Sequence, residues 1–390
     1  MLLNFIIKLL AVYRGNENLN EHNKMKFSLL ILVVMIALTS CKKPIVAPEN
    51  YKTAKRDFQW TIDSLEYDVP GRLPPEQVSI FTIWGSSSKD VFAVGHSDIP
   101  SGRLWRYDGR KWTPDKKWNI SGFDPNGIDY IVYPYAVSGF DAQNVFVACN
   151  RYYEDHPDSA MIIKWNGSAW SEVPWINGKR VSGGASWIVT QNNLRFWSPS
   201  FLGIIIKYEN GFLSPEPQFT DFRIFGSYIA ALENGEVYVN ARKDSMNNDN
   251  LLGSITKLFK RDITGQWSLI EDKFISGSYE DGYGLGLGLF CIGNRLFTTN
   301  RGIWEKIGNN WRLVLSLWQY GGDCFISENN IWFYFRHQVW HWNGKDWAQI
   351  DIPILKNYPG SFLYGRGWSD GDEIFLSLHH NSMTYIVHGK

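Results

Sequence analysis

Short apolar segments separated by small polar turns run along most of this chain, and they set the expected secondary structure. The clearest example reads WGSSSKDVFAVG over residues 84–95 and continues as LWRYDGRKW over residues 104–112. A turn of small polar residues precedes residues 90–92, and a second tight turn at residues 108–109 leads to Trp112. Asp and Gly at such places are typical of hairpin turns. The segment therefore predicts four short antiparallel strands.

The turn that leads into an apolar and aromatic strand recurs along the chain. Its middle apolar residue returns at intervals of 35 to 59 residues, which suits a four-stranded unit with loops of variable length. The seven copies lie at residues 90–92, 144–146, 193–196, 236–238, 295–297, 330–332 and 373–375. A second marker, a turn that closes onto an aromatic residue, follows in six of the units, at Trp112, Trp170, Phe212, Trp267, Trp311 and Trp347.

The seventh unit reaches the end of the chain before any such aromatic residue. Residues 58–62 alternate like a strand and contain Trp60. We expect this segment to supply the missing outer strand and to close a ring by pairing the two ends of the chain, which also removes exposed sheet edges. The predicted fold is all-β, a single β-propeller over residues 58–390. Seven four-stranded blades fit the markers best, and six or eight stay open.

Composition agrees with this fold and narrows the partners. The 390 residues include 19 Trp, 19 Tyr and 23 Phe, and aromatic residues at this density favour strands. The 39 basic and 39 acidic residues cancel. Nucleic acid is therefore not expected as a partner, because its binding normally needs a basic surface. The cysteines after Cys41 form no CxxC pair, so no metal or other cofactor is predicted.

The N-terminal residues carry a targeting pattern. Residues 25–40 have a charged start, a short apolar run and small residues before Cys41, which predicts a lipoprotein signal peptide and acylation of Cys41. A transmembrane helix is the alternative, but the apolar run of about a dozen residues is shorter than the roughly twenty that span a bilayer. We interpret residues 1–24 as an extension from a start site placed too far upstream, and residues 41–57 as a tether.

Two resemblances support these interpretations. Residues 84–95 followed by residues 107–112 are similar to the W-G-x-S-x-x-D-V-W-A-V-G and H-Y-D-G-x-x-W repeat of bacterial β-propeller proteins, many of them secreted or lipid-anchored. The likeness is close in the first repeat, fair in the second and sixth and faint elsewhere, and together the repeats cover about residues 58–390. It implies an architecture like that of Kelch and WD40 proteins. The shared residues are structural, so it implies no active site.

The signal also resembles that of Bacteroidetes-type lipoproteins. This implies a lipid-anchored protein of the bacterial outer membrane, on the periplasmic side or at the cell surface. Surface-exported members usually carry acidic residues just after the cysteine, whereas Lys42 and Lys43 follow it here. The side of the membrane therefore stays open.

Candidate functional residues are sought in loops, because the repeated strands are scaffold. In a propeller, the loops between the second and third strands of each blade share one face with the connections between blades. These are the long loops of this chain, residues 240–254 among them, and we call this side the long-loop face. Its candidates for ligand binding are Tyr152, Tyr153, Asp155, His156, Trp175, Arg180, Arg336 and His379.

Three classes of function fit this pattern. A binding module would capture a glycan or a peptide at the cell envelope through aromatic faces. A scaffold would hold an envelope complex together, and a propeller hydrolase or lyase would use two carboxylates or a His and Tyr pair across the central funnel. The binding module is favoured, as a monomer with a glycan or protein partner and with its lipid in the membrane.

Overall fold

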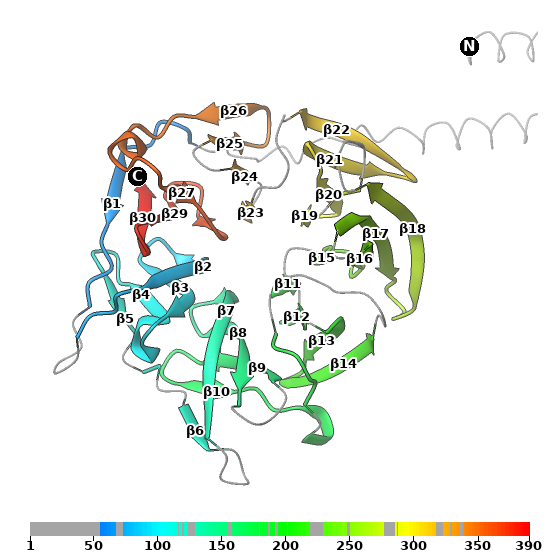
Figure 1. Cartoon of the computed structure of the whole chain (residues 1–390), viewed down its shortest axis with the longest axis horizontal. Helices are drawn as coiled ribbons and strands as arrows, with labels where there is room; N and C mark the ends of the chain where they lie inside the picture. Colours follow the sequence, from blue (N-terminus) through cyan, green and yellow to red (C-terminus); the bar gives the residue numbers. More distant parts are fainter. Residues whose placement is uncertain are drawn as a thin grey trace, which may run out of the picture. The chain divides into compact units, whose positions relative to one another are not determined.

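The apolar segments form strands, and these assemble into seven sheets. In the computed structural model the described residues are 55–67, 73–115, 117–118, 121–123, 129–153, 158–178, 180–185, 188–191, 194–200, 202–218, 229–247, 250–276, 285–286, 288–316, 323–327, 330–335 and 338–390. They belong to one unit, Thr53–Lys390. Within this described part the sheets stand around a central opening as the blades of a β-propeller (Figure 1). The prediction of an all-β propeller with seven blades is confirmed.

Each blade is an antiparallel sheet whose four main strands run from near the centre of the ring to its rim, and blade 2 has a fifth strand, Ser121–Phe123, that lies farther out (Figure 1). Blade 1 contains β2 (Val78–Ser87), β3 (Asp90–Ser97), β4 (Leu104–Tyr107) and β5 (Trp112–Pro114). Blade 2 contains β6 (Ser121–Phe123), β7 (Asp129–Asp141), β8 (Asn144–Tyr152), β9 (Ser159–Trp165) and β10 (Trp170–Glu172). Blade 3 contains β11 (Val189–Gln191), β12 (Arg195–Pro199), β13 (Ile204–Glu209) and β14 (Phe212–Gln218).

The second half of the ring is built in the same way. Blade 4 contains β15 (Ile229–Ala231), β16 (Val237–Asn247), β17 (Asn250–Arg261) and β18 (Trp267–Ser276). Blade 5 contains β19 (Gly288–Ile292), β20 (Arg295–Thr299), β21 (Gly302–Ile307) and β22 (Asn310–Ser316). Blade 6 contains β23 (Asp323–Ser327), β24 (Asn330–Phe335), β25 (Gln338–Trp342) and β26 (Trp347–Ile350). Blade 7 contains β27 (Phe362–Leu363), β28 (Trp368–Ser369), β29 (Ile374–His380), β30 (Met383–Gly389) and β1 (Trp60–Asp63).

Helical structure in the described residues is confined to short 3₁₀ turns in the connections. These are η1 (Pro100–Gly102), η2 (Ile176–Gly178) and η4 (Pro353–Asn357). No helix of the described residues combines the length and the apolar character that crossing a membrane requires.

The N-terminal strand takes the place of the missing outer strand. In blade 1, Trp112 lies opposite the partner of Val91 in the ladder. In blade 7, Trp60 lies in the same register opposite the partner of Ile374. The aromatic residue that blade 7 lacks at the end of the chain thus comes from β1, which pairs with β30.

Two further contacts hold the N-terminal segment on the ring. The buried His388 ring of β30 lies between two carboxylates, with Nδ1 2.9 Å from Asp63 Oδ2 and Nε2 2.7 Å from Glu373 Oε2. Arg56 lies against blade 6, where Nη1 is 2.7 Å from Asp346 Oδ1. The segment is therefore held on blade 6 by an ion pair and on blade 7 by the contact between Asp63 and His388 as well as by the ladder.

The third repeat departs from its predicted register. Leu194, expected in the strand, lies in a turn with a left-handed φ of 52°, and Phe196 takes the buried position instead. In the outer strand Leu213 is buried where Phe212 was expected, and Phe212 is exposed. The side-chain period of a strand is two residues, so the one-residue shift from Phe212 to Leu213 exchanges the core face for the solvent face. The shift from Leu194 to Phe196 is two residues and places the buried residue beyond the turn.

The prediction of a long loop at residues 240–254 is also wrong. β16 and β17 continue through most of it as a paired hairpin, with Asn240 opposite Leu258 and Asp244 opposite Ser254. Pairing satisfies backbone groups that a free loop leaves to water. The sequence gives little warning of this, because the segment is rich in polar residues that are typical of loops.

His341 of β25 is a buried imidazole whose pKa is strongly lowered. Its ring stacks on Trp332 with centroids 3.8 Å apart, and Nε2 lies 3.1 Å from Asn330 Oδ1. Burial, followed by the positive charge of Arg56, lowers the pKa of His341 to about 3. The folded protein therefore keeps this ring neutral.

This ring should make the stability depend on pH. Below about pH 6.5 the unfolded chain binds a proton on His341, whereas the folded chain binds it only near its lowered pKa of about 3. The free energy of unfolding should therefore fall as the pH decreases through this window, by up to about 1.4 kcal/mol per pH unit. Thermal melts between pH 7 and pH 4.5 measure the slope. His341→Phe should flatten it, and an unchanged slope in this variant would assign the dependence to other groups.

Candidate functional site

The structure brings some of the predicted ligand-binding residues to one face and removes others. Asp155, His156 and Arg336 lie outside the described residues. Tyr152, at the end of β8, is 42% exposed, and His379, near the end of β29, is half-buried. Both strands end at the long-loop face, so these two residues are accessible to a ligand there.

Tyr153 and Trp175 are buried, which corrects the expectation that both rings are exposed on loops. Trp175 is 7% exposed, lies in the core shared by blades 2 and 3, and forms a bridge with Leu213. Tyr153 is 8% exposed and packs against the Tyr130 ring, with centroids 6.0 Å apart. A large ring next to the edge of the core stabilises the fold more when it packs over that edge than when it faces water.

The charge of Arg180 is engaged in a small ion-pair network. Its guanidinium lies 3.4 Å from the carboxylate of Glu172. The same carboxylate accepts a hydrogen bond of 2.6 Å from the buried Arg151. Arg180, predicted to bind a ligand, is therefore held beside a carboxylate.

Aromatic side chains do gather on the long-loop face, from inner-strand positions that sequence reasoning missed. In β2 the ladder shifts register around Phe81, because Ile80 and Thr82 pair with consecutive residues of β3. In β7 the same shift surrounds Tyr135. A bulge of this kind leaves one extra residue unpaired in the ladder and redirects its side chain. Both rings are half-buried.

Blade 7 has an aromatic residue at the equivalent irregularity. Its inner strand is interrupted between β27 and β28, and Tyr364 lies in the gap. The next residue, Gly365, has a φ of +74°, and a Cβ there would lie 2.3 Å from the carbonyl oxygen of Phe81. Arg366 then donates its backbone N–H to that oxygen at 2.8 Å. Glycine thus allows the backbone of blade 7 to approach β2 and sets Tyr364 beside Phe81.

The three rings make contact across the blades. The centroids of Tyr364 and Phe81 are 6.0 Å apart with an edge-to-face angle of 74°. Those of Phe81 and Tyr135 are 5.9 Å apart, and the rings are stacked at 14°. The row therefore passes from blade 7 through blade 1 to blade 2.

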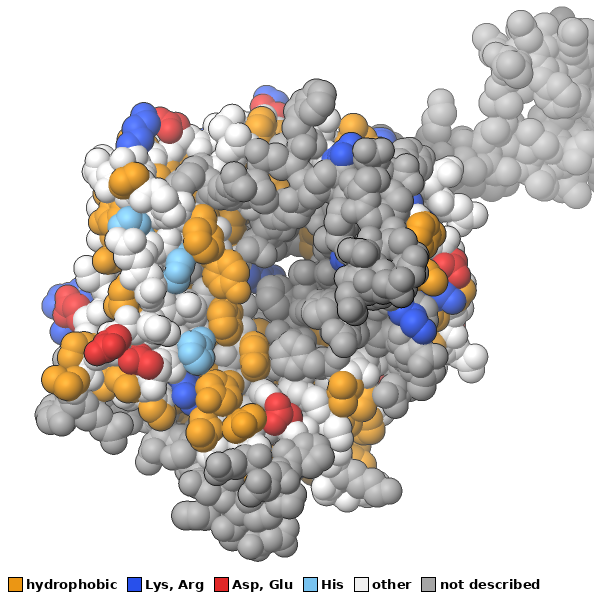
Figure 2. Space-filling model, in the orientation of Figure 1, with side chains coloured by type: hydrophobic (Ala, Val, Ile, Leu, Met, Phe, Trp, Pro, Cys, Tyr) orange, Lys and Arg blue, Asp and Glu red, His pale blue; other side chains and the backbone are white. Residues whose placement is uncertain are grey.

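Phe362 continues the row in blade 7, and a separate pair of rings, Tyr133 and Tyr152, lies in blade 2. Phe362 meets Tyr364 edge-to-face at 6.2 Å, and Tyr133 meets Tyr152 edge-to-face at 6.2 Å. Phe362 and Tyr364 are 40% and 41% exposed. Figure 2 shows this face, with hydrophobic side chains gathered along one side of the central opening and His side chains beside them. We call this set the aromatic strip: Phe362, Tyr364, Phe81, Tyr135, Tyr133 and Tyr152.

Imidazole and guanidinium groups border the strip. His379 lies 5.1 Å from the ring of Phe362, and His96 stacks on Tyr133 at 6.1 Å. The guanidinium of the buried Arg103 lies 4.3 Å from the centre of the Tyr133 ring.

At the end of the strip in blade 2, burial and then the charge of Asp158 raise the pKa of Tyr135, so this hydroxyl stays neutral. The strip thus combines flat apolar faces with neutral hydroxyls and a partly basic border. Such a surface binds by stacking and by a few hydrogen bonds. Among the described residues, no group of three or more His, Cys, Asp or Glu side chains is placed to hold a metal ion.

A sequence signal for the strip exists in the repeat. Phe81, Tyr135 and Tyr364 each lie ten residues before the buried apolar residue of their repeat. With the third repeat in its corrected register, the same count in the other four blades gives Ser186, Ser227, Gly286 and Gly321. Small residues are expected where inner strands crowd the axis, so aromatic residues in three consecutive blades are a departure that the scaffold does not require.

Comparisons with known proteins support the fold. No protein-family profile matches the chain, and no curated protein matches it. Among solved structures it is similar to YCF48 bound to D1 peptide, with a TM-score of 0.51 and 16% identity over 84% of this chain and 96% of that chain. YCF48 from Cyanidioschyzon merolae has a TM-score of 0.47 and 13% identity, covering 84% and 98%. The WD40 propeller domain of Doa1 has a TM-score of 0.46 and 10% identity, over 85% of this chain and 97% of that chain. Because the identity to the first of these structures is only 16%, the similarity shows the fold alone. The chain has the fold of a β-propeller.

Proposed function

We propose that this protein is a ligand-binding module of the bacterial cell envelope and that the aromatic strip is its binding surface. The observation that carries the proposal is the row of Tyr364, Phe81 and Tyr135, placed at matching irregularities of three neighbouring inner strands. Tyr364 is 41% exposed, and the rings of Phe81 and Tyr135 are half-buried. Apolar patches that stay partly accessible on a protein surface commonly mark interaction sites. The strip is therefore the part of the described surface best suited to a ligand.

The shape of the strip favours an extended peptide over a glycan. Phe362 and Tyr364 meet at 86°, and Tyr133 and Tyr152 meet at 77°. Perpendicular rings form notches that side chains can enter, whereas a sugar chain needs flat faces in succession. The similar YCF48 structure holds a D1 peptide. That ligand belongs to that protein, and here it illustrates only that a propeller of this size can carry a peptide.

A parallel screen tests the proposal. Residues 51–390 are presented to a peptide library and to a glycan array, together with two variants. Tyr152→Ala/Tyr364→Ala removes two exposed rings of the strip, and Phe274→Ala removes a ring that is 53% exposed on the rim strand β18. The proposal predicts peptides that bind the wild type and the Phe274 variant and are lost with the strip variant. Ligands that bind the strip variant as tightly as the wild type would place the site elsewhere. If only glycans bind the wild type and lose their binding to the strip variant, the ligand is a glycan and not a peptide.

Anchoring at the membrane is part of the proposal and rests on the pattern before Cys41. Because the apolar run is too short to span, retention in the membrane should depend on the acyl chains. Cys41→Ser should therefore release a soluble, folded protein or leave an unprocessed precursor. Membrane fractionation with and without detergent measures this. A mature form of the Ser variant that still needs detergent would refute anchoring through Cys41.

A further inference from the structure

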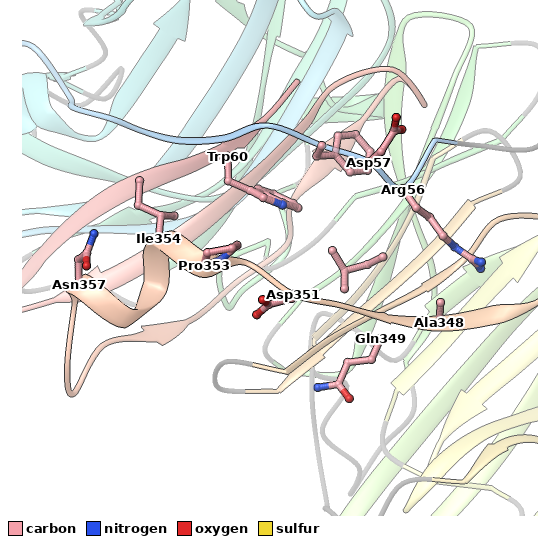
Figure 3. Close-up of a pocket in the computed structure, with 11 residues that line it drawn as sticks. Arg56, Asp57, Trp60, Ala348, Gln349, Asp351, Pro353, Ile354 and Asn357 are labelled. Atoms are coloured by element: carbon pink, nitrogen blue, oxygen red, sulfur yellow. The ribbon is translucent and has the colours of Figure 1, made fainter.

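A cavity of about 730 Å³ lies at the rim of the ring between blades 6 and 7, apart from the aromatic strip. One wall is the N-terminal segment with Arg56, Phe58 and Trp60, and the other is formed by β26 and η4 (Figure 3). It exists because the N-terminal segment crosses this joint. Gln59 exchanges backbone hydrogen bonds of 2.8 and 3.0 Å with Lys390.

The aromatic part of the cavity is Trp60. Its counterpart in blade 1, Trp112, is fully buried, whereas Trp60 is only half-buried. The Phe58 ring lies behind it, with centroids 5.4 Å apart. Figure 3 shows the Trp60 side chain directed from β1 toward Pro353 and Asp351 on the opposite wall. One indole face is thus held in place by the core and turned to the cavity.

The polar part of the cavity consists of carboxylates and amides: Asp57, Asp351, Gln349 and Asn357. Asp57, Asp351 and Asn357 are exposed. Among the described residues, the structure gives no hydrogen-bond or ion-pair partner to the side chains of these four. The cation of the cavity, Arg56, is engaged by Asp346 at 2.7 Å and by the carbonyl oxygen of His341 at 3.1 Å. The groups that remain for a ligand are therefore two carboxylates and two amides.

We infer that this cavity binds a neutral hexopyranose unit of a glycan. The C–H face of a pyranose ring packs on an indole ring, and its hydroxyl groups can donate to carboxylates and accept from amide N–H groups. The volume lies in the range of about 300–1,000 Å³ that is usual for small-ligand sites. Acidic sugars are excluded because the Asp351 carboxylate lines the space and Arg56 is already paired. An ammonium group is less well served, because cation recognition of this kind uses a cage of several aromatic rings and Trp60 offers one face.

The cavity lies at the joint where the N-terminal segment closes the ring, so binding there should affect the stability of the fold. Its two walls belong to the N-terminal segment and to blade 6, so a sugar bound between them favours the closed ring. A ligand that binds only the folded state raises its stability in proportion to the logarithm of concentration over Kd. Sugar binding should therefore raise the melting temperature of the protein.

The test uses the full-length protein with the methyl glycosides of glucose, galactose, mannose and N-acetylglucosamine, and with tetramethylammonium chloride as the cationic probe. Saturation-transfer NMR and thermal melts measure binding. We expect at least one glycoside to bind and to raise the melting temperature. Asp351→Asn should weaken it about tenfold or more and Trp60→Phe more strongly. Asp351 lies on the surface, so its variant keeps the test valid if Trp60→Phe folds poorly.

The strip variant Tyr152→Ala/Tyr364→Ala is the matched control. It should bind the glycoside as the wild type does, whatever it does to peptide binding, so the two sites can fail independently. The inference is overturned if none of the four glycosides binds, or if tetramethylammonium binds in their place. It is also overturned if glycoside binding is unchanged by Asp351→Asn, or if it is lost with the strip variant.

Discussion

A chain that begins at Val69 should melt roughly 10 °C below a chain that begins at Tyr51, or should aggregate when it is produced. The shorter chain lacks Phe58 and Trp60, and each of these rings contributes on the order of 2 kcal/mol through burial. It also lacks Asp63, so His388 loses one of the two carboxylate neighbours described for it and keeps Glu373. The unpaired edge of β30 then becomes available for aggregation.

The total loss of about 5 kcal/mol or more is large against the 5–15 kcal/mol by which domains are usually stable. Asp63→Asn in the longer chain is the matched control, because it keeps β1 and its ladder with β30 while it removes one charge beside His388. It should lower the melting temperature by much less than the truncation. Equal melting temperatures of the two truncated chains would show that β1 does not close the ring in an energetic sense.

The second large effect is expected in ligand binding. Tyr152→Ala/Tyr364→Ala should weaken the binding of a peptide taken from the library by about 100-fold, because a stacked interface ring contributes on the order of 1–2 kcal/mol. Both rings are more than 40% exposed, so the melting temperature should change by no more than about 2 °C. Titration calorimetry and thermal melts measure the two quantities on the same samples.

The control for this effect is a buried ring of the same region. Tyr152→Ala/Tyr153→Ala should lower the melting temperature clearly, because Tyr153 packs against Tyr130 and the two-ring variant opens the edge of the core. Binding that falls in this variant but not in Tyr152→Ala/Tyr364→Ala would mean that stability and not the strip governs affinity.

The repeat markers predicted the architecture well because they report packing. The seventh unit lacks the turn and aromatic residue of the outer strand, which predicts that residues 58–62 with Trp60 supply them. The register confirms this, because Trp60 and Trp112 lie at equivalent positions of their ladders. The predicted register of the third repeat is wrong because Leu194 lies in a turn, where its side chain is exposed and does not pack in the core. An apolar residue next to a turn can belong either to the turn or to the strand, and the sequence alone does not distinguish the two.

The candidate site was only partly predictable. The site was expected in loops, and of the predicted residues Tyr152 and His379 lie at the ends of strands on the long-loop face, whereas Phe81 and Tyr135 lie at irregularities within inner strands. A bulge does not change composition, so it is visible in the sequence only as a spacing of ten residues from each repeat marker. Burial of Trp175 depends on contacts between blades 2 and 3, and Tyr153 packs against Tyr130 within blade 2. A single sequence reveals neither contact. The cavity beside Trp60 depends on where the N-terminal segment lies.

A crystal structure of residues 51–390 with the tightest-binding peptide tests the central claim most directly. The account predicts electron density for the peptide along the aromatic strip, in contact with Phe81, Tyr135 and Tyr364 and crossing blades 7, 1 and 2. Density confined to the outer blade edges or to the face of the tight turns would contradict it.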